Sequence, residues 1–215
     1  MRTVVVFEWM SLDGVVQAPA YSDEDTSGGF KHGGWHLPYF EDRSMKWVVD
    51  GVSGAGGFLF GRRTYDVFAA HWPNASQEEQ PLAQPLNMLP KYVASRTLKE
   101  PLAWQNSMLL GADIAESVTK LRRQDGKPLL VIGSTQLAAA LLAQDLVDEL
   151  RLMIDPVVLG GGKRFFRDDG VCRRLTLAAS ETTSTGAILA TYARSSADAP
   201  AGARAVPLPR PPRRR

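Results

Sequence analysis

Cysteine, histidine and long apolar runs are scarce in this chain, and each scarcity excludes a class of protein. A single cysteine, Cys172, among 215 residues excludes an intramolecular disulfide and a cysteine-rich metal site. The three histidines, His32, His36 and His71, are too scattered to indicate a metal site by spacing. No apolar run has the roughly 20 residues needed to span a bilayer. The N-terminal run ends at Glu8 without a cleavage-like site, which indicates a strand rather than a signal peptide. We therefore expect a cytoplasmic protein without metal or membrane span.

The net charge of +2 is unevenly distributed along the chain. Residues 201–215 contain five arginines and no acid, which leaves 20 basic and 23 acidic groups on the other 200 residues. The main body is thus mildly acidic, which argues against a broad nucleic-acid surface. We predict a folded domain over residues 1–197 and a disordered Pro/Arg-rich tail over 198–215. Nucleic-acid binding through the arginines is a separate hypothesis, which truncation after residue 200 would test.

Short β-rich runs alternate with helical patterns in the first two thirds of the chain, and strands without helices follow. This order predicts an α/β protein with a mostly parallel sheet and an antiparallel C-terminal closure. Residues 11–35 form a long polar, glycine-rich loop, and a loop of that length is usually functional. Strands are predicted over 3–10, 57–60, 91–94, 107–110, 128–132, 149–154, 175–180 and 188–193, and helices over 39–49, 62–70, 114–123 and 136–143.

Three polar turns follow predicted parallel strands, at 61–64, 95–97 and 133–136. The first, Gly61-Arg62-Arg63-Thr64, combines a helix start with two cations and a hydroxyl, which suits a phosphate group. The same stretch suits a structural turn with solvated arginines, and alone it does not decide between the two. Ligands of open α/β sheets bind at the carboxyl ends of the strands. The three turns together therefore favour a nucleotide site.

Several motifs occur in an order and spacing that resemble the dihydrofolate reductase-like superfamily, in the branch related to the C-terminal reductase domain of bacterial riboflavin biosynthesis proteins. The resemblance covers residues 3–195 and implies a mixed, mostly parallel eight-stranded sheet flanked by helices, with NADPH bound across the strand ends. The matching motifs are Ser11-Leu12-Asp13-Gly14, Phe60-Gly61-Arg62-Arg63-Thr64-Tyr65, Ser95-Arg96-Thr97, Val131-Ile132-Gly133-Ser134-Thr135, Leu146-Val147-Asp148-Glu149-Leu150-Arg151 and Pro156-Val157-Val158-Leu159-Gly160-Gly161-Gly162-Lys163.

The resemblance also implies roles for the three turns. Ser95 and Arg96 would contact the adenosine 2′-phosphate, which favours NADPH over NADH. The pyrophosphate would lie against the first turn, and the nicotinamide end would approach the third. The family commonly has three small residues, mostly glycine, in the third turn, whereas this chain has only one glycine there. The cofactor-binding residues implied in the first and third turns are Gly61, Arg62, Arg63, Thr64, Gly133, Ser134, Thr135 and Gln136.

On the substrate side, Trp35-His36-Leu37-Pro38 resembles the tryptophan-x-leucine-proline run of dihydrofolate reductases. Two residues beyond that proline those enzymes place the carboxylate that binds the pterin ring, and this chain has Phe40 there. Asp13 is the other candidate acid, and a turn-forming aspartate is its alternative role. Trp35 and Tyr39 are predicted either to stack a heteroaromatic substrate or to serve as plain core.

The leading hypothesis is an NADPH-dependent reductase that transfers hydride to a small pterin- or pyrimidine-like ring, with the long loop excluding water. A stand-alone riboflavin-pathway pyrimidine reductase is one alternative. A catalytically silent nucleotide-binding regulatory module is another, and the missing carboxylate supports it. Relatives of this type are often dimers, so the resemblance also implies a possible homodimer.

Overall fold

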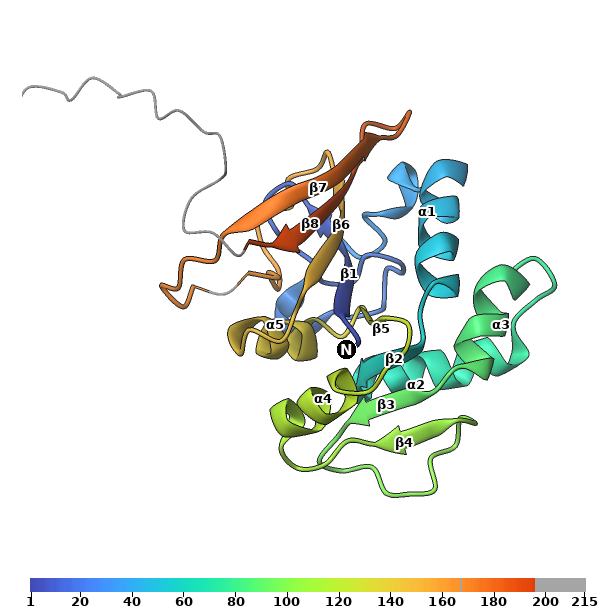
Figure 1. Ribbon diagram of the computed structural model, residues 1–215. Helices are drawn as coiled ribbons and strands as arrows, with labels where there is room; N and C mark the ends of the chain where they lie inside the picture. The colour runs from blue at the N-terminus through green and yellow to red at the C-terminus, as the bar shows by residue number, and fades with distance from the viewer. Residues whose placement is uncertain (167, 196–215) are drawn as a thin grey trace, which may run out of the picture.

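Eight strands form one sheet in the order β4-β3-β2-β5-β1-β6-β8-β7 in this computed structural model, which describes residues 1–166 and 168–195 (Figure 1). In this order, every neighbouring pair of strands between β4 and β6 is parallel, whereas β8 is antiparallel to both of its neighbours, β6 and β7. The predicted sheet is therefore confirmed, and the predicted tail lies outside the described residues. The strands are β1 (Val4–Ser11), β2 (Gly57–Gly61), β3 (Lys91–Ala94), β4 (Ser107–Leu109), β5 (Leu129–Ile132), β6 (Glu149–Asp155), β7 (Leu175–Thr182) and β8 (Ile188–Arg194).

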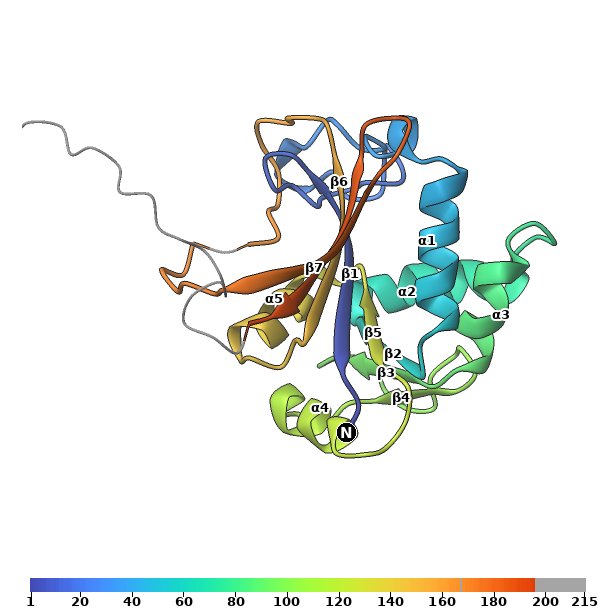
Figure 2. The ribbon, with the colours of Figure 1, turned by 45° about the horizontal axis from the view of Figure 1, so that its top comes forward.

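Helices cover both faces of the sheet. Figure 2 shows α1 (Asp42–Ser53), α2 (Arg62–His71) and α3 (Gln80–Met88) on one side of the central strands, with α4 (Ile114–Arg122) and α5 (Thr135–Ala143) on the other. Short 3-10 turns occupy Ser27–Gly29, Leu37–Tyr39 and Trp72–Asn74. Within the described ranges, no helix has both the length and the apolar character needed to cross a membrane.

The central strand β1 is buried on both faces because its side chains alternate between two cores. Val4 and Val6 pack in the cluster that includes residues of α4 and α5. Val5 and Phe7 pack in the opposite cluster with residues of α1 and α3. This alternation explains why the apolar run at the start of the chain is continuous rather than broken by polar residues.

Two helices differ from the prediction. A helix was expected over 39–49, but the chain makes a 3-10 turn, continues extended at Phe40 and Glu41, and enters α1 only at Asp42. The Glu41 carboxylate accepts hydrogen bonds from the backbone N–H and the hydroxyl of Ser184, which holds this break against the β7–β8 hairpin. Helix α3 was not predicted because Pro81 and Pro85 interrupt its helical signal.

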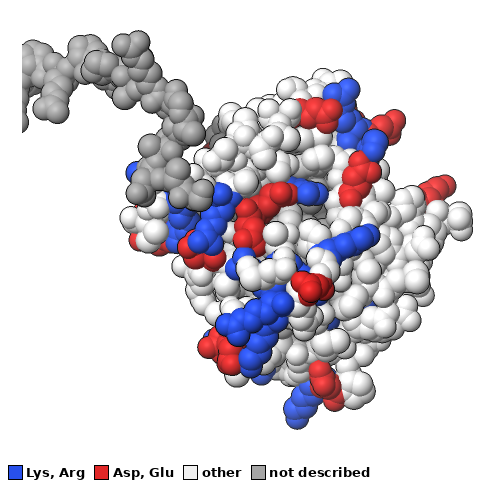
Figure 3. Space-filling view, in the orientation of Figure 1, with Lys and Arg blue, Asp and Glu red and all other residues white. Residues whose placement is uncertain are grey.

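Basic and acidic side chains are interspersed on the face shown in Figure 3, without one large basic surface. Among the described residues, no group of three or more histidine, cysteine, aspartate or glutamate side chains is arranged to hold a metal ion.

Candidate functional site

The three polar turns lie at one edge of the sheet. Strands β3, β2 and β5 are neighbours and run parallel, so the turns that follow them emerge together at the carboxyl edge. We call these the edge turns: 95–97 after β3, 61–64 after β2 and 133–136 after β5.

Direct hydrogen bonds join the edge turns. The Gly61 backbone N–H donates to Ser134 Oγ at 2.9 Å, and the Ser134 backbone N–H donates to Thr64 Oγ1 at 3.1 Å. Arg62 Nη1 donates to Thr97 Oγ1 at 2.8 Å. Segments up to about 70 positions apart in the sequence are therefore bonded into one rim, with the turn 61–64 at its centre.

Two helices begin at this rim, and their N-terminal N–H groups have no side-chain cap among the described residues. Gly61 precedes α2 and Ser134 precedes α5, and neither provides a capping hydrogen bond. Each uncapped helix start carries free N–H donors and the positive end of the helix dipole. Two such ends at one edge fit a group with two negative phosphates, so the donor set suits the pyrophosphate of a dinucleotide.

The turn before α5 has a left-handed backbone. Gly133 has φ +58° and Ser134 has φ +56°, and the second value is uncommon for a residue with a side chain. The two hydrogen bonds of Ser134 compensate for this conformation. They also explain the departure from the family's small-residue pattern, because the serine side chain occupies the space beside Gly61 and bonds its N–H.

The cationic side chains of the rim differ in how they are held. Arg62 is bonded to Asp66 Oδ2 at 3.3 Å as well as to Thr97. The other two cations, Arg63 and Arg96, are exposed like Arg62, and so is the uncharged Gln136. Ser95 Oγ accepts hydrogen bonds from the backbone N–H groups of Thr97 and Leu98, at 3.1 and 3.0 Å. The Ser95 hydroxyl also lies 3.5 Å from Thr97 Oγ1, within the same turn as Arg96. The binding roles of these residues stay predictions.

Glu8 is a buried carboxylic acid that the sequence analysis treated only as the end of an apolar run. It is 3% exposed, and Thr135 Oγ1 donates to its Oε1 at 3.4 Å. Burial raises the pKa of Glu8 to about 8, the Thr135 hydrogen bond opposes the rise, and the Glu24 carboxylate adds to it. Glu8 is therefore mostly protonated at neutral pH, beside the start of α5. Its position two residues after Val6, on the same buried face, was the available signal.

Asp13 links two loops. Its carboxylate accepts hydrogen bonds from Ser11 Oγ at 2.7 Å and from the backbone N–H groups of Leu159 and Gly160 at 3.1 and 3.0 Å. Although burial acts to raise it, these hydrogen bonds hold the pKa of Asp13 below its usual value. An ionised, fully engaged carboxylate suits the turn-forming alternative, and its role as an acid stays a prediction.

An ionisable pair lies in an aromatic cluster at the ends of β1 and β6. His36 Nδ1 is 2.8 Å from Asp155 Oδ2, and their side chains are 7% and 0% exposed. The imidazole lies 5.7 Å from the ring of Trp9, 6.2 Å from that of Trp35 and 5.1 Å from that of Phe40. Sequence analysis missed this pair because its partners lie 119 positions apart.

The predicted substrate-stacking residues border the same cluster. Trp35 is buried, its indole Nε1 donates to the Gln17 carbonyl at 2.8 Å, and its ring meets His36 edge-on. Tyr39 is partly exposed and packs against the small core cluster of Met153 and Leu189. Both residues are thus near the pair, and their stacking role stays a prediction.

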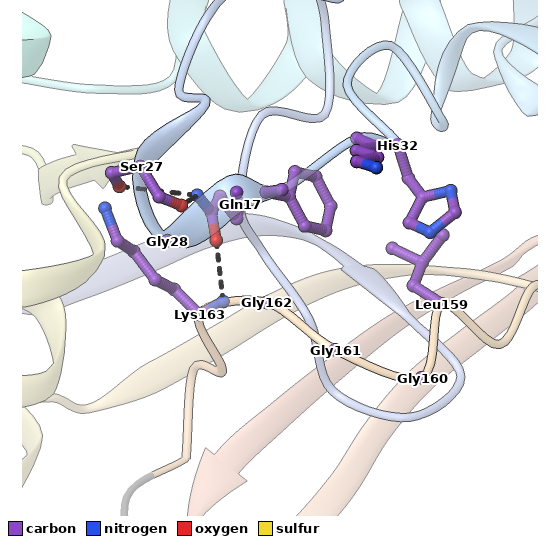
Figure 4. A pocket seen from close by; sticks show the side chains of 12 residues that line it. Gln17, Ser27, Gly28, His32, Leu159, Gly160, Gly161, Gly162 and Lys163 are labelled. Carbon is purple, nitrogen blue, oxygen red and sulfur yellow. Dashed lines mark hydrogen bonds between the residues drawn. The ribbon is translucent and has the colours of Figure 1, made fainter.

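A pocket of about 570 Å³ separates the long loop from the connection after β6 (Figure 4). Gln17 bridges the two walls: its Nε2 donates to the Ser27 carbonyl at 3.0 Å, and its Oε1 accepts from the Lys163 N–H at 3.0 Å. Lys163 Nζ is paired with Asp25 at 2.5 Å. The long loop is therefore bonded to Lys163, directly after the glycine-rich segment 160–162, rather than lying free.

The eight-stranded sheet with its antiparallel closure and its carboxyl-edge rim has the architecture of the dihydrofolate reductase-like fold. The RibD C-terminal domain matches residues 2–189, and the chain belongs to that family.

Among relatives, the "Uncharacterized protein YyaP" of Bacillus subtilis (strain 168) is 32% identical over 136 residues, which are 62% of this chain and 71% of that protein. A structure described as a riboflavin biosynthesis protein from Shewanella sp. PV-4 has a TM-score of 0.64 at 22% identity, covering 90% of this chain and 99% of its own. A pyrimidine reductase-like protein from Corynebacterium diphtheriae has a TM-score of 0.59 at 12% identity, covering 90% and 92%. At these identities the two structures show a shared fold.

Proposed function

We propose that this protein is an NADPH-dependent reductase that transfers a hydride to a carbon of a C=N or C=O bond in a small pterin- or pyrimidine-like substrate. The observation that carries the proposal is the hydrogen-bonded rim, which brings two uncapped helix starts and several cationic side chains to one edge of the sheet. Membership of the RibD C-terminal domain family supports it.

The rim residues divide the work of holding the nucleotide. The starts of α2 and α5 would bind the pyrophosphate through backbone N–H groups, because anions are stabilised at helix N-termini. Ser95 and Arg96 would bind the 2′-phosphate through a hydroxyl and a guanidinium. The bound cofactor supplies the hydride, and the surrounding chain must orient the substrate, exclude water and deliver a proton.

NADPH binding to the full chain tests this proposal, with tryptophan fluorescence as the readout. We expect NADPH to bind more tightly than NADH, and Arg96→Ala to weaken NADPH binding about tenfold or more while leaving NADH binding nearly unchanged. Arg123→Ala is the matched control, since Arg123 is exposed at the end of α4. The neighbouring Arg122 carbonyl accepts from the Arg2 N–H just before β1, which puts this end of α4 at the amino edge of the sheet, opposite the edge turns. Absence of NADPH binding by the unaltered protein would overturn the proposal.

The silent regulatory module is a second candidate because Phe40 replaces the pterin-binding carboxylate. A panel of pterins, quinonoid compounds and pyrimidines distinguishes the two candidates. NADPH binding with oxidation on one of these compounds supports the reductase. NADPH binding without oxidation on all of them supports the regulatory module.

A further inference from the structure

The His36–Asp155 pair has no assigned role, and its place at the ends of β1 and β6 calls for an explanation. Asp155 is the last residue of β6 and pairs with Ser11 at the end of β1. Two positions earlier Trp9 pairs with Met153, so Trp9 and Asp155 project from the same face of the sheet. The loop after β1 returns His36 to this face. The pair thus lies at the carboxyl edge, which is where ligands of such sheets bind.

Two buried polar atoms of this cluster have no hydrogen-bond partner among the described residues: Asp155 Oδ1 and Trp9 Nε1. Buried polar groups are almost always bonded, so unpartnered ones call for an explanation. One is an acceptor and the other a donor, and both belong to residues that contact the His36 ring or its Nδ1. Because both atoms are closed to solvent, a partner would have to enter the cluster, and a planar heterocycle with a ring N–H and a neighbouring acceptor carries groups of the matching kinds.

The free nitrogen of His36 completes the arrangement. Nδ1 is occupied by Asp155, whereas Nε2 has no partner within the described part of the chain and is not among its fully buried unpartnered atoms. Nε2 is therefore the accessible nitrogen of an otherwise buried ring. A carboxylate that holds one imidazole nitrogen and leaves the other free is a recurrent arrangement for proton transfer.

We propose that His36 donates the proton that accompanies hydride transfer and that Asp155 is the positioning residue that holds its imidazole. This inference rests on the proposed reductase function. Asp155 is the titratable side chain in contact with His36 among the described residues. The other rings of the cluster are uncharged. They come from β1 (Trp9), from the loop before α1 (Trp35 and Phe40) and from α1 (Trp47).

The step balances as follows for a C=N substrate. Hydride from the reduced nicotinamide, which is thereby oxidised, forms a C–H bond, and the π electrons move to the ring nitrogen. The imidazolium of His36 gives its Nε2 proton to that nitrogen, so that an N–H bond forms and the imidazole becomes neutral. A proton taken up from solvent then restores the imidazolium at Nε2, so that the net reaction consumes one hydride and one proton. Asp155 changes neither its bonds nor its charge in this step.

Nitrogen NMR of the imidazole rings tests the arrangement in the full chain without requiring turnover. Asp155 accepts from Nδ1, so neutral His36 is expected to carry its proton on Nδ1. His71 contacts Glu79 through Nε2 at 2.6 Å and is expected to carry its proton on Nε2. In Asp155→Asn the preference at His36 should be lost while that of His71 stays. A proton on Nε2 of neutral His36 in the unaltered protein would overturn the inference.

A ligand titration gives the second readout. With NADP⁺ present, 6-methylpterin is the probe, and the Nε2 resonance of His36 is expected to shift while the resonances of His71 do not. An unshifted His36 signal at a probe concentration that saturates tryptophan quenching would overturn the inference, and so would the absence of probe binding.

Kinetics separate this inference from the proposed function. His36→Gln is expected to lower kcat about 100-fold or more, with NADPH binding unchanged. Asp155→Asn should lower kcat less and leave KM nearly unchanged. His71→Gln is the matched control, because it removes an exposed histidine–carboxylate pair. If His36→Gln turned over at the unaltered rate, the proton-donor role would fall and the reductase function would stand. If the unaltered protein did not bind NADPH, the function and this inference would fall together.

Discussion

Glu8 makes the stability of the protein depend on pH, and Glu8→Gln is the change that shows it. Its side chain is 3% exposed between β5 and β6, and its pKa is raised to about 8 from a value of 4.5, chiefly by burial. Glutamine keeps the size and the polar contact with Thr135 but has no proton to lose. The substitution therefore removes the ionisation and little else.

The sign follows from which state binds the proton more tightly. A carboxyl group whose pKa is raised on folding favours the folded state while it is protonated. That contribution is fully present below about pH 4.5 and is lost as the pH rises to about 8. The difference between these two pKa values corresponds to about 5 kcal/mol of unfolding free energy, at 1.36 kcal/mol per pH unit. Between about pH 5.5 and about pH 8.5, the unaltered protein should lose about 3 kcal/mol of unfolding free energy relative to Glu8→Gln.

Urea unfolding at a series of pH values, followed by tryptophan fluorescence, measures this difference. Other groups titrate in both proteins, so the quantity of interest is the gap between the two curves at each pH. Glu78→Gln is the control, because Glu78 is exposed and its curve should run parallel to that of the unaltered protein. Parallel curves for Glu8→Gln as well would refute the buried-acid reasoning.

Three further predictions concern the loops and the rim. Ser134→Ala should lower the unfolding free energy by about 1–2 kcal/mol, because the Gly61 N–H loses its acceptor. Ser134→Gly should lower it by less, since glycine suits a φ of +56°. Urea unfolding of both variants measures the difference. A Cβ at Gly162 would come within 2.8 Å of a phenylalanine ring carbon at a φ of +121°, so Gly162→Ala should cost about 2 kcal/mol or more, whereas Gly161→Ala, with open space around it, should have little effect in the same assay. The lowered pKa of Asp13 stabilises the fold above its usual value of 3.8, so the stability deficit of Asp13→Asn should shrink as the pH falls below about 4, which acid-range thermal unfolding would detect.

The sheet was predictable because its signals are local. Each strand is a short β-rich run bounded by glycine, proline or polar residues, and β3 begins and ends where the sequence places it, at 91–94. The antiparallel closure follows from the absence of helical patterns among the last strands. Helix α3 shows the limit, because two prolines hide a helix that packs through Ala83 and Leu86.

The rim was predictable for a related reason. Parallel neighbours deliver their carboxyl ends to one edge, so turns that are distant in sequence are brought together by topology alone. The hydrogen bonds that Ser134 makes were not predictable, because they depend on its left-handed backbone and on the distance to the next turn. Its apparent departure from the family's small residues thus coincides with a structural contact between two of the edge turns.

The contacts of Phe40, at the position where dihydrofolate reductases place their carboxylate, also could not be predicted from the sequence. In this chain Phe40 is extended, outside α1, and its ring lies 5.1 Å from that of His36. A carboxylate at this position would therefore bring a second negative group toward Asp155, whose pKa burial already raises. An aromatic ring instead keeps the surroundings of the pair apolar, which strengthens the electrostatic hold of Asp155 on the imidazole. The absence of a carboxylate at position 40 and the presence of the His36–Asp155 pair are therefore physically coupled. Phe40→Asp should disrupt the aromatic cluster rather than restore a pterin site.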